Sequence, residues 1–356
     1  MNHFTFSWGS NYIAVRGLLR ALGHELSSPP RITPAIVQRG IELAHPFLCF
    51  SGKLVLGQIA AQLEKGDRRL AFMSSLGPEA CRCADTCDYM DSLFGGYTGF
   101  SAHRFGGGSF DQALANLRSH FGPSVRRHQV VKAYAAFLGK VDLIHKVEKR
   151  CTALRCLAAT PGRVRELKRE ALQRIDRAAG PAALWRVSRW FDRGAGSLPL
   201  REEGPALRVG VVGGEHILCE LDSIMAVIEE TAERGIFLDW RGGFRLLARA
   251  TRASLEPLKE KCRGHLHGAP STSEVFSCAH AVDFIREGYD GLLHVYAFGC
   301  MPQTAIKPIL QRMAASAGVP LLSLSIGDRF AEEGLENRLE AFIDLLQARK
   351  GKGVGK

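Results

Sequence analysis

The sequence lacks any uninterrupted run of the roughly 18 apolar residues that a membrane-spanning helix needs. The segment Met1–Trp8 contains neither the basic region nor the apolar region of a secretory signal. The P-loop pattern G-x-x-x-x-G-K-[ST] is absent, and the strand-ending run Val209–Glu215 lacks the G-x-G-x-x-G pattern of a dinucleotide loop. We therefore expect a cytoplasmic protein without a membrane span. The run Val209–Glu215 is expected to end a strand in a turn that lines the interdomain cleft, and any ATP hydrolysis is expected to belong to a partner.

The chain has 356 residues, of which 46% are apolar and 23% are charged. These ordinary values exclude disorder, collagen and coiled coil, and the length allows two domains with separate cores. Strand and helix patterns alternate at both ends of the chain, which predicts an α/β fold with two doubly wound parallel sheets. We expect an N-terminal α/β domain at residues 1–120, a basic helical segment and linker at 121–205, and a C-terminal α/β domain at 206–350.

The two α/β blocks have different predicted elements. In the first block, strands are expected at His3–Trp8, His24–Ser27 and Leu70–Ser74, and helices at Asn11–Leu22, from Thr33-Pro34 onward and at Leu54–Glu64. In the second block, strands are expected at Leu207–Gly213, Ile236–Leu238, Leu292–Ala297 and Leu321–Ser325, and helices at Ile224–Arg234, Val282–Glu287, Thr304–Ala315 and Leu335–Ala348. Thr33 before Pro34 is typical of a helix start, because Thr caps the helix and Pro fits its first position.

The middle segment carries most of the positive charge. Residues 121–205 contain 18 Lys or Arg against 8 Asp or Glu, which is +10 of the chain's net +11. Three or four helices are expected there, broken near Pro161 and Pro181. This surface is compatible with a solvated helical face or with docking of an acidic partner or coenzyme A phosphates. Nucleic acid binding is disfavoured, because Trp185 and Trp190 lie among basic residues without a base-reading motif.

The ten cysteines are unusual for a cytoplasmic chain. Structural disulfides are not expected in a reducing compartment, which favours metal binding or catalysis as the role of some of these cysteines. We expect about half of the ten to be small buried hydrophobic residues. Cys49, Cys81 and Cys300 each follow a strand or precede a helix, at positions where α/β folds collect ligands. A helix N-terminus lowers the pKa of a thiol and stabilises an anionic cluster. These positions predict an iron–sulfur site in the interdomain cleft; the alternative is three structural cysteines.

Two sets of short motifs carry a family resemblance. At the C-terminal end they are Phe298-Gly-Cys-Met-Pro302, Val319–Leu324, Asp328 and Arg338–Phe342, and at the N-terminal end they are Leu22-Gly23, Ser28-Pro-Pro30, Cys49-Phe50, Leu63–Gly66 and Gly77-Pro78. With these motifs the chain resembles the 2-hydroxyacyl-CoA dehydratase superfamily, and in particular its stand-alone branch related to acyl-CoA dehydratase activases.

The resemblance implies two Rossmann- or flavodoxin-like domains around an oxygen-sensitive 4Fe-4S cluster held by Cys49, Cys300 and a cysteine of the Cys81 group. It also implies an ATP-hydrolysing activator that supplies single electrons at low potential for reduction of a CoA thioester or another small molecule. Glu79 and Ala80 separate Gly77-Pro78 from Cys81, whereas the family pattern places the cysteine directly after Gly-Pro. Cys83 and Cys87 are additional cysteines at i,i+4 spacing, which would place them on one face of a helix. The sequence therefore leaves open which of Cys81, Cys83 and Cys87 is the third ligand, and it is also compatible with a double-cubane cluster.

Two further alternatives follow from the sequence. A non-catalytic cluster module that carries electrons for an activase system would need the same cysteines, and either form is compatible with a homodimer. A zinc site is the second alternative, from the residues Cys262, His265, His267, Cys278 and His280. Their spacing fits no common zinc pattern, so a His-rich loop beside a buried Cys278 is the preferred interpretation, and His267-Gly268 is similar to a His-Gly element of the family that would favour a cleft position.

Overall fold

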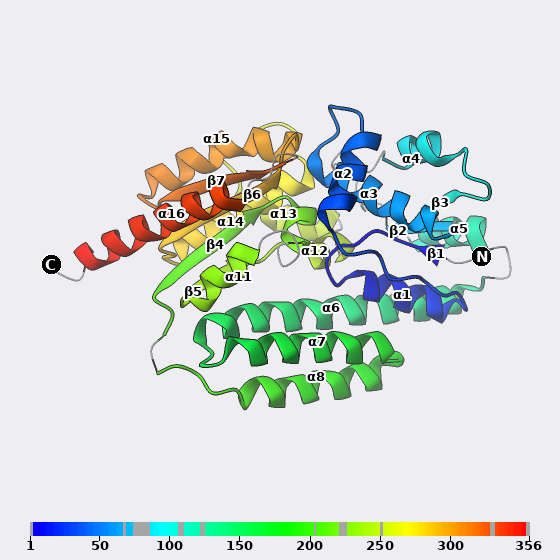
Figure 1. Ribbon diagram of the computed structural model, residues 1–356, viewed down its shortest axis with the longest axis horizontal. Coiled ribbons are helices and arrows are strands. Elements are labelled where there is room, and N and C mark those ends of the chain that lie inside the picture. Colours follow the sequence, from blue (N-terminus) through cyan, green and yellow to red (C-terminus); the bar gives the residue numbers. More distant parts are fainter. Residues whose placement is uncertain are drawn as a thin grey trace.

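The computed structural model describes residues 3–66, 69–73, 86–105, 110–121, 125–202, 204–220, 226–249, 252–327 and 332–353. Two sheets with exclusively parallel strand pairs form within these residues, with helices packed around them (Figure 1). The strand order is β1-β2-β3 in the first sheet and β5-β4-β6-β7 in the second. This arrangement confirms the predicted α/β class with two Rossmann- or flavodoxin-like parallel-sheet domains.

The first sheet is short and its helices dominate the N-terminal part of the chain. Its elements are β1 (His3–Phe4), α1 (Tyr12–Ala21), α2 (Pro34–Leu43), α3 (Phe50–Glu64), β2 (Arg69–Met73), α4 (Thr86–Phe94), β3 (Ser101–Phe105) and α5 (Phe110–Phe121). Helix α2 begins as predicted, because the Thr33 hydroxyl accepts a hydrogen bond from the backbone N–H of Ile36 at 3.4 Å.

Four predictions for this part were wrong. The strand expected at His3–Trp8 ends at Phe4, since the following residues bond to the C-terminal unit and not to a neighbouring strand. The strand expected at His24–Ser27 is a single bridge between Leu26 and His3. Strand β3 was missed because its polar residues weaken the strand pattern. Helix α3 starts at Phe50 and not near Leu54 or Gly52, so Cys49 is its N-cap residue.

The C-terminal unit follows the predicted order with longer helices. Its elements are β4 (Leu207–Gly213), α9 (Glu215–Cys219), α11 (Ala226–Glu233), β5 (Ile236–Trp240), α12 (Phe244–Arg249), α13 (Arg252–Lys261), α14 (Thr272–Arg286), β6 (Gly291–Ala297), α15 (Met301–Ser316), β7 (Leu321–Ile326) and α16 (Glu332–Gly353). The central strand β6 is buried along its whole length, as its continuous apolar run predicts. Helix α14 begins ten residues before the predicted Val282, because Ser271 and Glu274 form a capping box.

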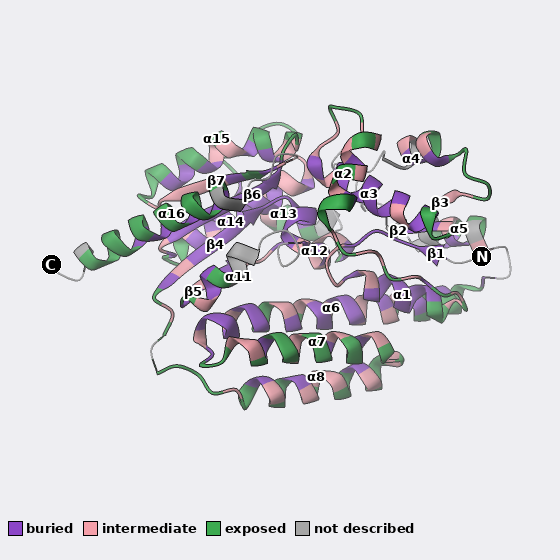
Figure 2. Cartoon of the chain, in the orientation of Figure 1, coloured by how far each residue is buried: buried purple, intermediate pink, exposed green. Residues whose placement is uncertain are grey.

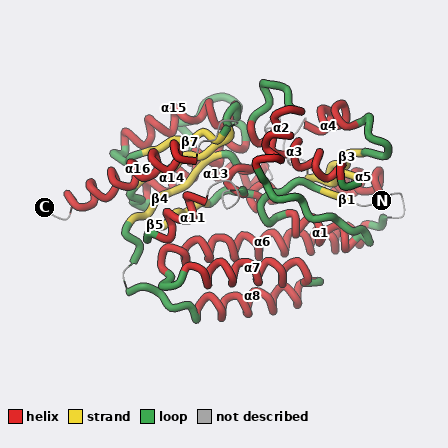
Figure 3. The backbone as a smooth tube through the Cα atoms, viewed as in Figure 1, coloured by secondary structure: helices red, strands yellow, loops and turns green. Residues whose placement is uncertain are grey.

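Three long helices form a layer along both sheets. They are α6 (Arg127–Leu157), α7 (Pro161–Arg177) and α8 (Gly180–Gly196), and α7 and α8 begin at the predicted Pro161 and Gly180-Pro181 breaks. In Figure 2 buried residues are concentrated on α6, whereas exposed residues predominate on α7 and α8. Helix α6 contacts both α1 and β5, so it bridges the two units (Figure 3). Among the described residues, no helix is long and apolar enough to cross a membrane.

The carboxyl ends of the two sheets meet at one junction. The loop after β1 approaches α9, where the backbone N–H of Gly9 donates to Glu220 Oε1 at 2.6 Å and His216 Nε2 lies 3.2 Å from the Ser7 carbonyl oxygen. At a second contact, the backbone N–H of Phe50 donates to the Phe298 carbonyl oxygen at 2.9 Å. These bonds hold the ends of β1, β4 and β6 together, in the region where open α/β folds bind ligands.

Two glycines set the position of α3, and thereby of Cys49. A Cβ atom at Gly57 would lie 2.1 Å from the Ile36 carbonyl oxygen, and one at Gly40 would lie 1.9 Å from the Lys53 carbonyl oxygen. Helices α2 and α3 therefore touch backbone to backbone, at a distance that no side chain permits.

This contact predicts the effect of a single added methyl group. Gly57→Ala should lower the free energy of unfolding by about 1–3 kcal/mol, because the helices must separate. The control Gly162→Ala, on α7, meets no atom within 4 Å, so it should be neutral or stabilising by up to about 1 kcal/mol. Urea unfolding measures both values, and equal effects of the two substitutions would contradict the packing account.

Candidate functional site: the cysteine junction

Cys49 and Cys300 come together at the junction, although they belong to different sheets. Cys49 is the N-cap residue of α3, and Cys300 is the N-cap residue of α15, directly after β6. A Cβ atom at Gly299 would lie 3.3 Å from Cys49 Cα, so the turn that carries Cys300 touches the residue that carries the first thiol. We call this pair the cysteine junction.

The electrostatic setting of the cysteine junction suits an anionic group. Helices α3 and α15 have 15 and 16 residues, and each brings the partial positive charge of its N-terminus to this point. Both cysteines are partly exposed and belong to no disulfide. Thiols with this access can be reached by a metal from solvent, whereas the thiols of Cys151 and Cys278 are buried in the core.

The remaining predicted ligands are placed only in part. Cys81 and Cys83 lie outside the described residues, and Cys87 lies in the first turn of α4, where only its backbone is described. Strand β2 runs parallel to β1 and ends at Met73. The carboxyl end of β2 therefore lies at the same edge of the first sheet as that of β1, and a third ligand from the residues between β2 and α4, which lie outside the described part of the chain, stays a prediction.

A buried polar network lies behind Cys300, and the sequence alone did not reveal it. The side chain of Gln303, in the first turn of α15, is fully buried. Its Oε1 atom lies 2.9 Å from His294 Nε2 and accepts from the Ser277 hydroxyl at 3.1 Å, while its Nε2 atom donates to Ser273 Oγ at 2.7 Å. Burial lowers the pKa of His294 to about 4, so the ring is neutral. The network fixes the start of α15 against β6 and α14.

A buried lysine and three exposed apolar residues lie close in sequence to the two cysteines. Lys53, one turn after Cys49 in α3, is 6% exposed, which is rare for lysine and typical of a paired or functional position. Phe47, Phe298 and Met301 are between 62% and 90% exposed. Large apolar side chains gathered beside a polar site mark a surface that contacts another molecule. We call these three residues the apolar rim.

The zinc interpretation does not hold in the structure. Among the described residues, no group of three or more His, Cys, Asp or Glu side chains is arranged to hold a metal ion. Cys262 and Cys278 lie in the core between α13 and α14, and His280 is buried beside Phe276. His265 and His267 are exposed and line a surface pocket next to α14 and α15.

The polar contacts of the junction include a buried carboxyl group. Glu215, at the start of α9, accepts a hydrogen bond from the backbone N–H of Gly243, and burial raises its pKa to about 7. Because this value exceeds the ordinary 4.5, the stability that the protonated carboxyl contributes is complete below pH 4.5 and is lost as the pH rises through 7.

Glu215→Gln should therefore change stability in a pH-dependent way. The amide keeps the oxygen that accepts from Gly243 and cannot ionise, so the variant should be more stable than wild type at alkaline pH, by up to about 3 kcal/mol. The difference should fall toward zero in acid. Urea unfolding of both proteins below pH 4.5 and above pH 7 tests this. A difference in the free energy of unfolding that is the same at the two pH values would show that the pKa of Glu215 is not raised in the folded protein.

Gly299 allows the close approach of the two cysteines. Its φ is +76° and a Cβ atom there would press on Cys49, whereas Gly318 has a φ of +67° with nothing within 4 Å. Ala at either position costs about 1–2 kcal/mol from the left-handed backbone alone. Gly299→Ala should cost more than Gly318→Ala in urea unfolding, and it should also increase the reactivity of Cys49 toward a thiol reagent. Equal costs and an unchanged reactivity would show that the two turns are not in contact.

Comparison with known proteins gives no family for the chain. No protein-family model matches it, and no curated protein is significantly similar to it. The chemistry of the site therefore has to be inferred from the cysteine junction and its surroundings.

Proposed function

We propose that the protein is an iron–sulfur protein in which Cys49 and Cys300 bind one cluster at the cysteine junction. The observation that carries the proposal is the contact of their two turns, made through the Phe50–Phe298 backbone hydrogen bond and the Gly299 approach. Phe50 and Leu54 of α3 belong to the same apolar core against which Cys300 packs, so this core holds the two partly exposed cysteines, each at a helix N-terminus, beside one another. One of Cys81, Cys83 and Cys87 is proposed as a third ligand.

The donor set of the junction fits such a cluster. Cysteine thiolates are the usual ligands of 4Fe-4S clusters, and soft sulfur ligands favour iron–sulfur clusters over hard cations. Aligned helix dipoles from α3 and α15 offset the negative charge that thiolates and sulfide bring. Three cysteine ligands on four irons would leave one iron open, and a double-cubane cluster would use the additional cysteines.

The proposed activity is low-potential, one-electron reduction of a CoA thioester or another small molecule, as in components of 2-hydroxyacyl-CoA dehydratases. When bound, the cluster supplies the one-electron chemistry. The chain itself positions the thiols through the Gln303 network and places Lys53 one turn from Cys49. The apolar rim offers an exposed apolar surface for a molecule that approaches the thiols.

A second candidate function is a non-catalytic electron carrier of an activase system. The apolar rim favours it, because Phe298 and Met301 flank Cys300 and are 63% and 62% exposed. A partner protein that contacts these residues would come close enough to exchange an electron directly. In either case, an ATP-hydrolysing activator is the proposed electron donor.

The basic helices suit an acidic partner or the phosphates of coenzyme A. On the outer helices, the Arg174 guanidinium lies 4.1 Å from the Trp190 ring centroid, and that of Arg189 lies 5.1 Å from the Trp185 centroid. Trp185 is 60% exposed. Arg174 also pairs with Glu170 at 2.6 Å, so of these two arginines it is Arg189, restrained by the Trp185 ring, that offers its charge to a partner.

Substitution of the ligands should remove iron without unfolding the protein. We expect Cys49→Ser and Cys300→Ser to lose most iron and sulfide after anaerobic preparation, because a hydroxyl is a poorer ligand than a thiolate. Cys156→Ser is the matched control: the Cys156 thiol donates to the Ala153 carbonyl oxygen at 3.0 Å, and a serine hydroxyl keeps that bond. Iron and sulfide analysis with electron paramagnetic resonance measures the result. Equal iron in wild type, Cys49→Ser and Cys300→Ser would refute the cluster assignment.

One measurement distinguishes an enzyme from an electron carrier. If the protein acts on a CoA thioester, adding a 2-hydroxyacyl-CoA to the reduced cluster should form several equivalents of enoyl-CoA and water per cluster, because this elimination is redox-neutral and the electron transferred to the thioester returns to the cluster. For an electron carrier, no enoyl-CoA should form, and the paramagnetic signal of the reduced cluster should decay only with a protein acceptor.

A further inference from the structure

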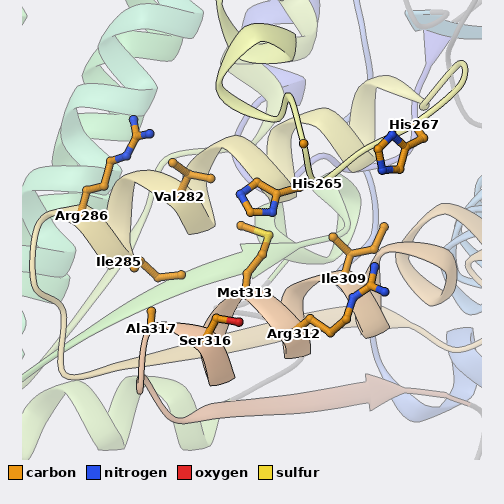
Figure 4. A pocket seen from close by; sticks show the side chains of 11 residues that line it. His265, His267, Val282, Ile285, Arg286, Ile309, Arg312, Met313, Ser316 and Ala317 are labelled. Atoms are coloured by element: carbon orange, nitrogen blue, oxygen red, sulfur yellow. The ribbon is translucent and has the colours of Figure 1, made fainter.

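A surface pocket of about 530 Å³ lies beside α14 and α15, away from the cysteine junction. It is formed by the C-terminal halves of these helices and by the loop after α13 (Figure 4). The lining residues of α15 begin at Ile309 and end beyond Ser316, whereas Cys300 caps the opposite end of that helix. At 1.5 Å per residue the pocket begins roughly 14 Å from Cys300 along the helix axis. The pocket is therefore a separate site.

The lining of this pocket combines an apolar floor with a cationic edge. Val282 and Met313 are 6% and 7% exposed and form the floor. Arg286 and Arg312 reach the pocket from α14 and α15, and Figure 4 shows Arg312 on the side of His267 and Arg286 at the other end. None of the lining residues carries a carboxylate.

The two arginines hold charge that the surrounding protein does not neutralise. Within the described part of the chain, neither Arg286 nor Arg312 has an ion-pair partner, whereas the neighbouring Lys261 is paired with Asp283 and Arg263 with Glu260. A guanidinium group presents a planar set of donors that matches the oxygens of a phosphate or a carboxylate. The volume lies in the range of pockets that bind small molecules.

We propose that this pocket binds a small amphipathic oxyanion, with an apolar body on Val282 and Met313 and a phosphate or carboxylate group held by Arg312 at the end of the pocket beside His267. Inorganic phosphate would gain nothing from the apolar floor, and a neutral apolar ligand would gain nothing from the Arg312 guanidinium, so each should bind more weakly than a ligand with both parts. The pocket does not depend on a cluster at the cysteine junction.

The methyl group of Met313 gives a site-specific probe for this proposal. The chain has six methionines, so protein labelled with ¹³C at the methionine methyl groups gives few signals, and Met313→Leu assigns the one in the pocket. Octyl phosphate and nonanoate are titrated as matched probes with the same eight-carbon alkyl body and different head groups. We expect a saturable shift of the Met313 signal, and the probe that binds more tightly identifies the head group.

Charge substitutions separate a specific site from unspecific adsorption. Arg312→Gln should weaken binding of the tighter probe at least tenfold, whereas Lys307→Gln, which removes a positive charge from α15 outside the pocket lining, should leave binding within twofold. Octanol, which has the same alkyl body and no charge, should bind at least tenfold more weakly when its binding is followed by the same Met313 signal. The proposal is overturned if the Met313 signal does not saturate, if the arginine variant binds as wild type does, or if octanol binds equally well.

Discussion

The contact between the turn before α15 and the start of α3 is the constraint on which the site depends. It consists of one backbone hydrogen bond, from Phe50 to Phe298, and of a glycine that lets the two turns touch. Because each turn begins a long helix, a small displacement at this point would move both helix N-termini away from each other. The glycine packing of α2 on α3, the Gln303 network under α15 and the bridging position of α6 all restrain this contact from different sides.

Much of the fold could be predicted because local signals were strong. Strand β4 has the predicted ends, and α7 and α8 begin at prolines that fit the first turn of a helix. The predictions failed where partners distant in sequence decide the structure. Residues after β1 look like a strand but bond to His216 and Glu220, and β3 pairs with β2 although its own pattern is weak.

The candidate site, like the fold, could be predicted from the sequence only in part. The positions of Cys49 and Cys300 at helix starts could be inferred from glycines and strand patterns, and the parallel-sheet rule placed both at a carboxyl edge. The sequence could not show that the two turns touch. The His294–Gln303 pair was also missed, because a histidine inside an apolar run and a glutamine after a proline carry no local signal of pairing. The burial of Lys53 was missed for the same reason.

Thiol cross-linking before and after cluster assembly tests the central claim most directly, since the claim is that Cys49 and Cys300 share one metal site. Metal-free protein is treated with a short bifunctional thiol reagent, and the bridged peptides are identified by mass spectrometry. The account predicts a Cys49–Cys300 bridge in the metal-free protein and its loss after anaerobic reconstitution with iron and sulfide, because the thiolates are then occupied. Absence of the bridge, or a bridge that forms equally well after reconstitution, would contradict it.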